Sequence, residues 1–249
     1  MKLNWQIDPN DVQRIKAFVD GQIDNPLVRS RITKNLADTK PAITKNDFWA
    51  WMVRMRLTSV QKSGPNSPVA KFNRSEPFPL SYEHICGAKH AKRFIADVLK
   101  NARGIRFTNK IPRELAANFE LLQSGEWTRA LNECNRLSRS VPQAVEREIA
   151  RYIDDKFEGF GPKQSRNLLQ ALGLTRFEIP IDSRVTQWLN KFGFPVHLTA
   201  SALADRHYYE FVSDGIQALC EDSGVYPCVL DAAIFASKDR NEWTDEAVY

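Results

Sequence analysis

Apolar residues recur at intervals of three and four along almost the whole chain, instead of at every second position. This spacing marks one face of an α-helix, whereas strict alternation marks a strand. The pattern predicts an all-α fold without a sheet or an internal repeat. We expect helices over residues 9–22, 29–35, 45–57, a short stretch from 68, then 88–102, 112–123, 126–137, 143–156, 162–172, 183–191, 199–220 (with a break allowed for) and 226–237.

Polar residues mark where several of these helices begin. Thr44 or Asn46 is suited to cap the helix that follows, because a short polar side chain accepts a backbone N–H there. Ser67 precedes a proline, the residue type best tolerated at the first helical position. Ser140 and Gln143 have the spacing of a capping box and predict the start of another helix.

The segment Phe157–Ser165 is typical of a helix end, a glycine turn and a second helix with a lysine in its first turn. Gly159 and Gly161 lack Cβ, so both can take positive φ and let their amides approach another backbone closely. Pro162 suits the first helical position, and the N–H groups of a helix N-terminus attract a phosphate. Lys163 would stand beside that anion.

A carboxylate follows this turn, since Asp182 lies 19 residues after Lys163. The combination resembles the helix-hairpin-helix DNA glycosylases, in which a G-h-G-x-K hairpin (h apolar) precedes an aspartate at a similar distance. The resemblance is close over residues 150–193 and weaker over 47–73 and 227–240. Within that superfamily the chain is most similar to the compact 8-oxoguanine glycosylases of archaea and some bacteria.

The resemblance implies a two-lobed helical layout. Residues 45–165 would form a central helical bundle that ends in the helix-hairpin-helix motif, at about 145–172. Residues 1–44 and 166–249 would join to form the second lobe. The implied activity is excision of a damaged or modified base from double-stranded DNA, with 8-oxoguanine as the first guess, followed by cleavage at the abasic site.

Lys163 and Asp182 are the candidate catalytic residues. By resemblance, Lys163 attacks C1′ of a flipped-out nucleotide, forms a Schiff base and promotes β-elimination. A lysine amine attacks only when unprotonated, so it needs a desolvated pocket or a nearby cation. Asp182 would stabilise the positive charge that develops on the sugar. The alternatives are that Lys163 only pairs with a phosphate and that Asp182 only caps a helix.

Further residues are candidates for DNA binding. The amides of Gly159 and Gly161 would bind a phosphate near the lesion, which carries no sequence preference. The segment L-T-S-V-Q ending at Gln61 is similar to the family segment whose polar side chain fills the gap left by the flipped nucleotide. Arg184 would reach a neighbouring phosphate. Gln61 as an exposed turn residue and Arg184 as a surface charge are the alternatives, and Arg166 is expected to be a solvated charge.

Aromatic residues are candidates for holding the flipped base. Phe235 is the best of them, because the corresponding C-terminal helix lines the base pocket in the related glycosylases, and Trp51 is the second choice. Trp49 and Trp188 are also considered, although an aromatic at helical spacing is more often part of a core. The family also implies a monovalent cation, Na⁺ or K⁺, on backbone carbonyls, which counting back from the lysine places on Asp155, Phe157 and Phe160.

Composition limits the remaining possibilities. The 35 Lys and Arg residues exceed the 30 acidic ones by only five, which permits nucleic-acid binding without demonstrating it. The four cysteines and four histidines are dispersed, so we expect neither an iron–sulfur cluster nor zinc. No apolar run has the length of a membrane span, and no signal peptide is recognised. We therefore expect a cytoplasmic, nucleoid-associated protein that does not bind membranes and acts as a monomer.

Two other functions stay open. The first is a glycosylase for another modified base, such as a hypermodified base of phage DNA that is excised in defence. The second is a helix-hairpin-helix module that binds DNA without catalysis and uses Lys163 only for a phosphate. Such a module has no need of Asp182 or of the long flanking helical segments.

Overall fold

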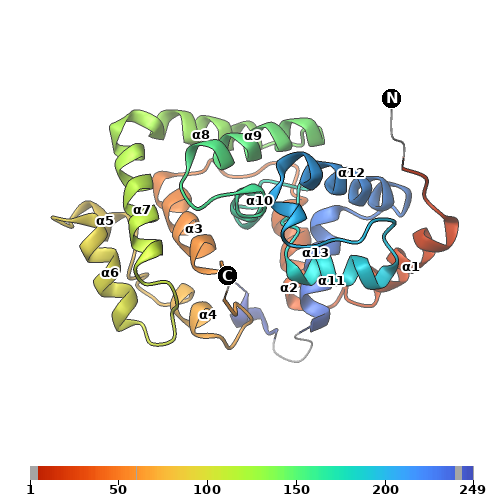
Figure 1. The fold of residues 1–249 in the computed structure, drawn as a ribbon, viewed down its shortest axis with the longest axis horizontal. Coiled ribbons are helices and arrows are strands. Elements are labelled where there is room, and N and C mark those ends of the chain that lie inside the picture. Colours follow the sequence, from red (N-terminus) through yellow and green to blue (C-terminus); the bar gives the residue numbers. More distant parts are fainter. Residues whose placement is uncertain (1–4, 60, 239–242, 249) are drawn as a thin grey trace.

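The computed structural model describes residues 5–59, 61–238 and 243–248, and over these residues the chain is helical (Figure 1). No β-strand occurs among them, and Thr39 and Arg139 form only an isolated bridge. The predicted all-α fold is confirmed. The α-helices are α1 Pro9–Asp20, α2 Pro26–Asn35, α3 Lys45–Leu57, α4 Pro68–Asn73, α5 Tyr82–Cys86, α6 Ala91–Asn101, α7 Lys110–Leu121, α8 Trp127–Arg136, α9 Gln143–Lys156, α10 Pro162–Ala171, α11 Ser183–Phe192, α12 Arg206–Asp222 and α13 Pro227–Lys238.

Three short helical turns complete the described chain. A π-helical turn, η1 Leu122–Glu126, joins α7 to α8, while η2 Ala202–Ala204 and η3 Asp245–Ala247 are 3₁₀ turns. The break allowed for in 199–220 lies at Asp205, which has an extended backbone and caps α12. The short helix α5 was not predicted; Ser81 caps it.

The predicted helix starts have mixed outcomes. Thr44 caps α3 in a full capping box with Asp47, and Ser67 caps α4. The capping box at Ser140 was wrong: α9 begins after Pro142 without a side-chain cap, and the Ser140 hydroxyl instead accepts from the Arg176 guanidinium at 3.0 Å. The proline explains this, because the residue before a proline is disfavoured in the helical conformation.

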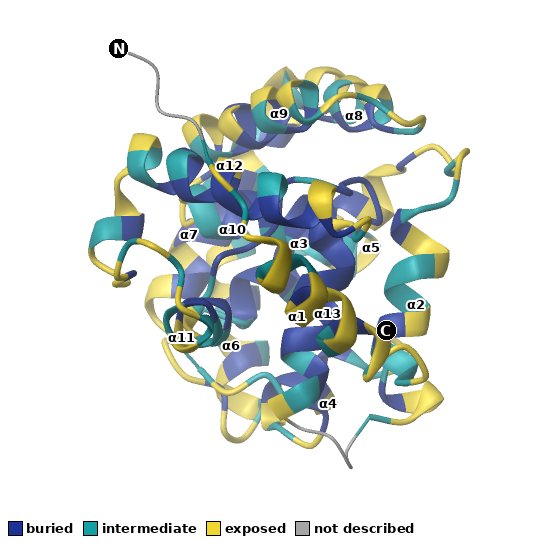
Figure 2. Ribbon diagram, turned by 90° about the vertical axis from the view of Figure 1, so that its right-hand side faces the viewer, coloured by how far each residue is buried: buried dark blue, intermediate teal, exposed yellow. Residues whose placement is uncertain are grey.

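Apolar side chains gather in two clusters. One is built mainly from α3 and α5–α10, and the other from α1, α2 and α11–α13. Figure 1 shows the first group on the left and the second on the right, with α10 between them, and Figure 2 shows the buried residues on the inner sides of the helices. The N-terminal helices pack on α12 and α13, so the two ends of the chain share one core. The first cluster continues through α10 to Leu174, beyond the predicted boundary at residue 165. The division of the chain at residues 44 and 165 therefore stays a prediction.

A buried ion pair joins α10 to the loop that precedes α11. The guanidinium of Arg166 donates to Glu178 at 2.5 Å, and both side chains are fully buried. Arg147 of α9 also donates to Glu178, at 2.8 Å, and reaches Asp214 of α12. Burial alone would raise the pKa of Glu178, but the two arginines hold it below its ordinary value. The sequence-based view of Arg166 as a solvated charge was therefore wrong.

The loop itself is held by a second carboxylate. Glu146 of α9 accepts the backbone N–H groups of Arg176, Phe177 and Glu178 at 2.8–2.9 Å. A buried carboxylate with three such donors satisfies backbone groups that the irregular loop would otherwise leave unpaired. The path of the chain towards Asp182 is thus fixed by α9.

We predict that Arg166→Met lowers the free energy of unfolding by about 3–5 kcal/mol, because it leaves Glu178 as a buried carboxylate with one arginine fewer. Urea denaturation measures this. The matched control is Arg136→Met, since Arg136 pairs with Glu148 on an exposed surface and should contribute less than about 1 kcal/mol. Equal effects of the two substitutions would contradict the role given to the buried pair.

Candidate active site

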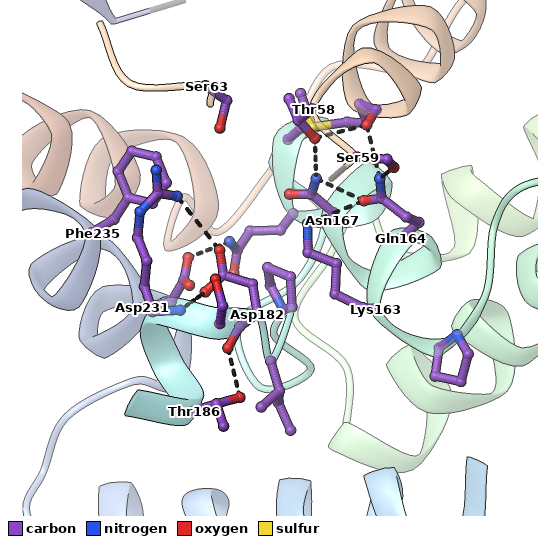
Figure 3. Close-up of a pocket in the computed structure, with 18 of the residues that line it drawn as sticks. Thr58, Ser59, Ser63, Lys163, Gln164, Asn167, Asp182, Thr186, Asp231 and Phe235 are labelled. Carbon is purple, nitrogen blue, oxygen red and sulfur yellow. Dashed lines mark hydrogen bonds and ion pairs between the residues drawn. The ribbon is translucent and has the colours of Figure 1, made fainter. Parts of the chain in front are cut away.

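A cavity of about 830 Å³ lies between the two apolar clusters (Figure 3). Its lining comes from α2, α3, the loop after α3, the start of α10, the loop before α11, and α13. Eight of the residues singled out from sequence line it: Trp51, Gln61, Gly161, Pro162, Lys163, Asp182, Arg184 and Phe235. Segments far apart in the chain therefore bring most of the predicted site to one place.

The two glycines of the hairpin have different roles. Gly159 has φ +82°, and a Cβ there would collide with the side chain of Arg56, which forms a buried ion pair with Glu114. Gly161 has an extended backbone (φ −80°, ψ −170°), so the expectation of positive φ was wrong for this residue. A Cβ at Gly161 would meet nothing within 4 Å, and the residue lines the cavity. Gly159 is thus required by packing, whereas Gly161 leaves room for a ligand.

Lys163 lies in the first turn of α10 and extends into the cavity (Figure 3). Its ammonium donates to the side-chain oxygen of Gln164 at 3.3 Å, and Gln164 in turn donates to the Met55 carbonyl at 3.1 Å. Burial lowers the pKa of Lys163, while the negative charges of Asp182 and Asp231 oppose this shift. The net shift is towards the neutral amine, the form of lysine that can act as a nucleophile.

Asp182 caps α11 and also faces the cavity. One carboxylate oxygen accepts the backbone N–H groups of Arg184 at 2.8 Å and Val185 at 3.1 Å. The other oxygen lies 3.5 Å from the Arg184 guanidinium. Capping of α11 was the alternative to a catalytic role for Asp182. The two roles are compatible, because capping fixes the carboxylate at the edge of the cavity.

A buried tyrosine positions the residues just before Asp182. The hydroxyl of Tyr209 donates to the Ile179 carbonyl at 2.8 Å and accepts the Ile181 N–H at 2.6 Å. Burial raises the pKa of this tyrosine, so its hydroxyl stays neutral and can donate one hydrogen bond and accept another. Tyr209 was not recognised from sequence, because an aromatic at helical spacing is typical of a core.

Asp231 of α13 is a second site carboxylate that sequence reasoning missed. It lines the cavity, accepts from the Gln170 amide at 2.6 Å and lies 3.9 Å from Arg31. Burial raises its pKa to about 6, and the neighbouring Arg31 opposes the shift. The signal was available: Asp231 is the only charged residue in the run Pro227–Ser237, and a lone acid inside an apolar helix indicates a buried carboxylate.

Some polar side chains around Asp231 have hydrogen-bonding atoms without a partner among the described residues. The side-chain oxygens of Gln170 and Asn35 and the Nη1 atom of Arg31 are buried and have no hydrogen-bond partner among the described residues. All three residues line the cavity. Buried polar atoms normally have hydrogen-bond partners. These three atoms lack one, so they are suited to bind the polar edge of a ligand.

The aromatic candidates separate into cavity and core. Phe235 lines the cavity, with the Arg184 guanidinium 3.8 Å from its ring centroid and Trp243 at 5.4 Å. Trp51 also lines the cavity, close to the cations of Lys34 and Arg54.

Trp49, Trp188 and Arg184 are the remaining candidates. Trp49 is fully buried and donates to the Leu80 carbonyl, and Trp188 stacks on Phe192 outside the cavity lining, so both belong to the core. Arg184 is partly exposed and stacks on Phe235 at the cavity.

The loop 102–109, which contacts Gln61, contains an exposed aromatic residue that was not predicted. The side-chain oxygen of Gln61 accepts the Arg106 N–H at 3.0 Å, and its amide donates to the Leu57 carbonyl. The neighbouring Phe107 is 39% exposed and has φ +61°. A bulky residue in this region of φ is strained, and such strain often marks a functional position.

The carbonyls proposed for a monovalent cation lie at the end of α9 and in the hairpin. Asp155 belongs to the last turn of α9, where carbonyls lack an intrahelical donor, and the Phe157 carbonyl accepts the Phe160 N–H at 3.2 Å. Oxygen donors of this kind fit Na⁺ or K⁺, so the cation stays a prediction. Among the described residues, no group of three or more His, Cys, Asp or Glu side chains is placed to hold a metal ion.

Comparison with solved structures identifies the fold. The chain is similar to the crystal structure of Methanocaldococcus jannaschii 8-oxoguanine DNA glycosylase, with a TM-score of 0.63 and 15% sequence identity over 94% of this chain and 95% of that one. The fold is that of a helical DNA glycosylase. No family model and no curated protein sequence matches the chain. In the part of the chain that the structure describes, no helix is long and apolar enough to cross a membrane.

We predict that the two hairpin glycines respond differently to alanine. Gly159→Ala should lower the free energy of unfolding by about 2–4 kcal/mol, because it adds left-handed strain to a collision with Arg56. Gly161→Ala should change it by less than about 0.5 kcal/mol, since an extended residue with open space accepts a methyl group. Thermal or urea denaturation of both variants tests this. A stable Gly159→Ala protein would contradict the packing described for the hairpin.

Proposed function

We propose that this protein is a DNA glycosylase of the helix-hairpin-helix superfamily with abasic-site lyase activity. The observation that carries the proposal is that Lys163, whose pKa burial lowers, shares one cavity with Asp182. The likeness of the fold to an 8-oxoguanine DNA glycosylase supports it. The partner is double-stranded DNA, bound by a two-lobed monomer with the site between the lobes.

The proposed reaction begins when a nucleotide is extruded from the duplex into the cavity. As the bond between the base and C1′ lengthens, Asp182 stabilises the positive charge on the sugar. The neutral amine of Lys163 forms a bond to C1′, and the base leaves with its electron pair and takes up a proton. Loss of a proton from nitrogen and opening of the sugar ring give a protonated Schiff base. Removal of a C2′ proton then expels the 3′ phosphate and cuts the strand.

The polar group around Asp231 supports a purine with a donor-rich edge. The unpartnered acceptors among the lining residues are the amide oxygens of Gln170 and Asn35, and the Asp231 carboxylate, which accepts from Gln170, lies beside them. Guanine-type bases, including 8-oxoguanine, present N1–H and an exocyclic amine on one edge, which match such acceptors. We therefore keep 8-oxoguanine as the first candidate. The cavity of about 830 Å³ also favours a second candidate, a base enlarged by hypermodification, as in phage DNA.

Substrate entry requires Arg184 to move. Its guanidinium covers a face of Phe235, the aromatic surface on which a flipped base would stack. On leaving Phe235, the arginine becomes available to a neighbouring phosphate, as its position after Asp182 first suggested. Gln61, which lines the cavity, and the exposed Phe107, which follows Arg106 in the adjoining loop, would fill and wedge the gap left in the duplex.

We predict that borohydride reduction in the presence of lesion-containing duplex yields a covalent protein–DNA adduct. Lys163→Gln should abolish the adduct, because an amide cannot form a Schiff base. Asp182→Asn should slow base release by at least about 100-fold, since the developing charge loses its carboxylate. A panel of duplexes with one modified base each serves as substrate, with Lys191→Gln as a control on an exposed lysine. No adduct with any damaged or abasic duplex would rule out the lyase activity, and base release without an adduct would indicate a glycosylase that uses water.

We also predict the pH dependence of adduct formation. Single-turnover trapping should rise with pH and level off, with a midpoint below the ordinary lysine value of 10.5, because the neutral amine reacts. In Asp231→Asn the midpoint should move to lower pH. The negative charge of Asp231 raises the pKa of Lys163, so its removal lets burial depress that pKa further. A midpoint that moves to higher pH would contradict this electrostatic assignment.

A further inference from the structure

The positive charge of the chain is concentrated in one segment, which we call the basic corner. Residues 89–113 hold eight Lys or Arg residues and one acid, Asp97, whereas the whole chain has an excess of only five. The remainder of the chain is therefore slightly acidic. All eight cations are exposed: Lys89, Lys92, Arg93, Lys100, Arg103, Arg106, Lys110 and Arg113.

The basic corner has a defined shape. It consists of α6, the loop 102–109 and the first turn of α7, which lie together at one end of the molecule in Figure 1. The apolar side of α6 is buried through Ile95 and Leu99, so its cations face outward. The loop packs tightly on α4, where a Cβ at Gly104 would collide with Pro68. The charges are thus carried by a helix and a braced loop.

The basic corner is continuous with the cavity. Arg106 lines the cavity, and its backbone N–H binds Gln61. From this loop, α6 extends for 11 residues, or about 16 Å at the helical rise. In a duplex, successive phosphates of one strand are about 3.4 Å apart along the axis, so this length matches about five base pairs.

We propose that the basic corner binds the phosphate backbone of duplex DNA flanking the extruded nucleotide, up to about five base pairs from it. The proposal rests on the proposed function, because it assumes that the duplex approaches the cavity. Exposed cations on one face supply sequence-independent affinity through counterion release. This suits an enzyme that searches DNA for rare bases, since most of its encounters are with ordinary sequence.

The test compares two double variants of equal charge. Lys92→Gln with Lys100→Gln alters the basic corner, and Lys16→Gln with Lys45→Gln alters exposed lysines elsewhere. Binding to undamaged duplexes is measured against salt concentration. We expect the corner variant to bind a duplex of about 20 base pairs roughly 5- to 20-fold more weakly, with a salt slope reduced by up to about 2. The control variant should keep the slope of the unaltered protein.

Duplex length and chemistry separate this proposal from the proposed function. On a duplex with about three base pairs on either side of the target, the difference between the corner variant and the unaltered protein should become smaller, because the phosphates that Lys92 would contact are absent. Borohydride trapping at saturating protein should be unchanged in the corner variant. An unchanged salt slope on the long duplex, or an equal loss in the control variant, would overturn the role of the corner. Absence of trapping with an intact corner effect would instead overturn the lyase activity alone.

Discussion

The ion pair between Arg166 and Glu178 sets the geometry of the candidate site. Arg166 lies one turn after Lys163 on α10, and Glu178 lies four residues before Asp182. The fully buried contact between them ties the helix that carries the amine to the loop that carries the carboxylate. Burying two charges is costly unless both are paired and further hydrogen-bonded, and Arg147 supplies the additional donors here. Because either charge would be costly to bury without its partner, the pair stays together and holds the two candidate catalytic groups in one cavity.

The parts of the site that local sequence determines were predictable. The glycine turn, Lys163 and the spaced Asp182 depend on helix ends and caps, which are written in neighbouring residues. Asp231 had a local signal as the lone acid of an apolar helix, whereas the burial of Arg166 was not predictable in the same way, because it depends on helices distant in sequence. A charged residue is exposed in most proteins, so the sequence alone favoured a solvated Arg166. The fold brought α9, α10 and α12 together around it, and this reversed the expectation.

The aromatic candidates also show what the sequence could not decide, in this case between residues that are close together in the chain. Helical spacing could not distinguish Trp49, which is core, from Trp51, which lines the cavity two residues later. The sequence placed Arg184 beside the site but gave no sign that it stacks on Phe235. That contact forms between α11 and α13, and it keeps an apolar surface covered by a planar cation. Such a surface would otherwise be open to water within a polar cavity.

The charges in the cavity balance in a way that bears on reactivity. Lys163 is desolvated, which disfavours its ammonium form, yet Asp182 and Asp231 act in the opposite direction. The pKa of Asp231 is itself raised to about 6 by burial, so its opposing charge is present above that pH and lost below it. Arg31 and Gln170 hold this carboxylate, the former by an ion pair and the latter by a hydrogen bond. The pKa of Lys163 is therefore set by distant segments together, since α13 and the start of α11 supply the carboxylates and the hairpin supplies the amine.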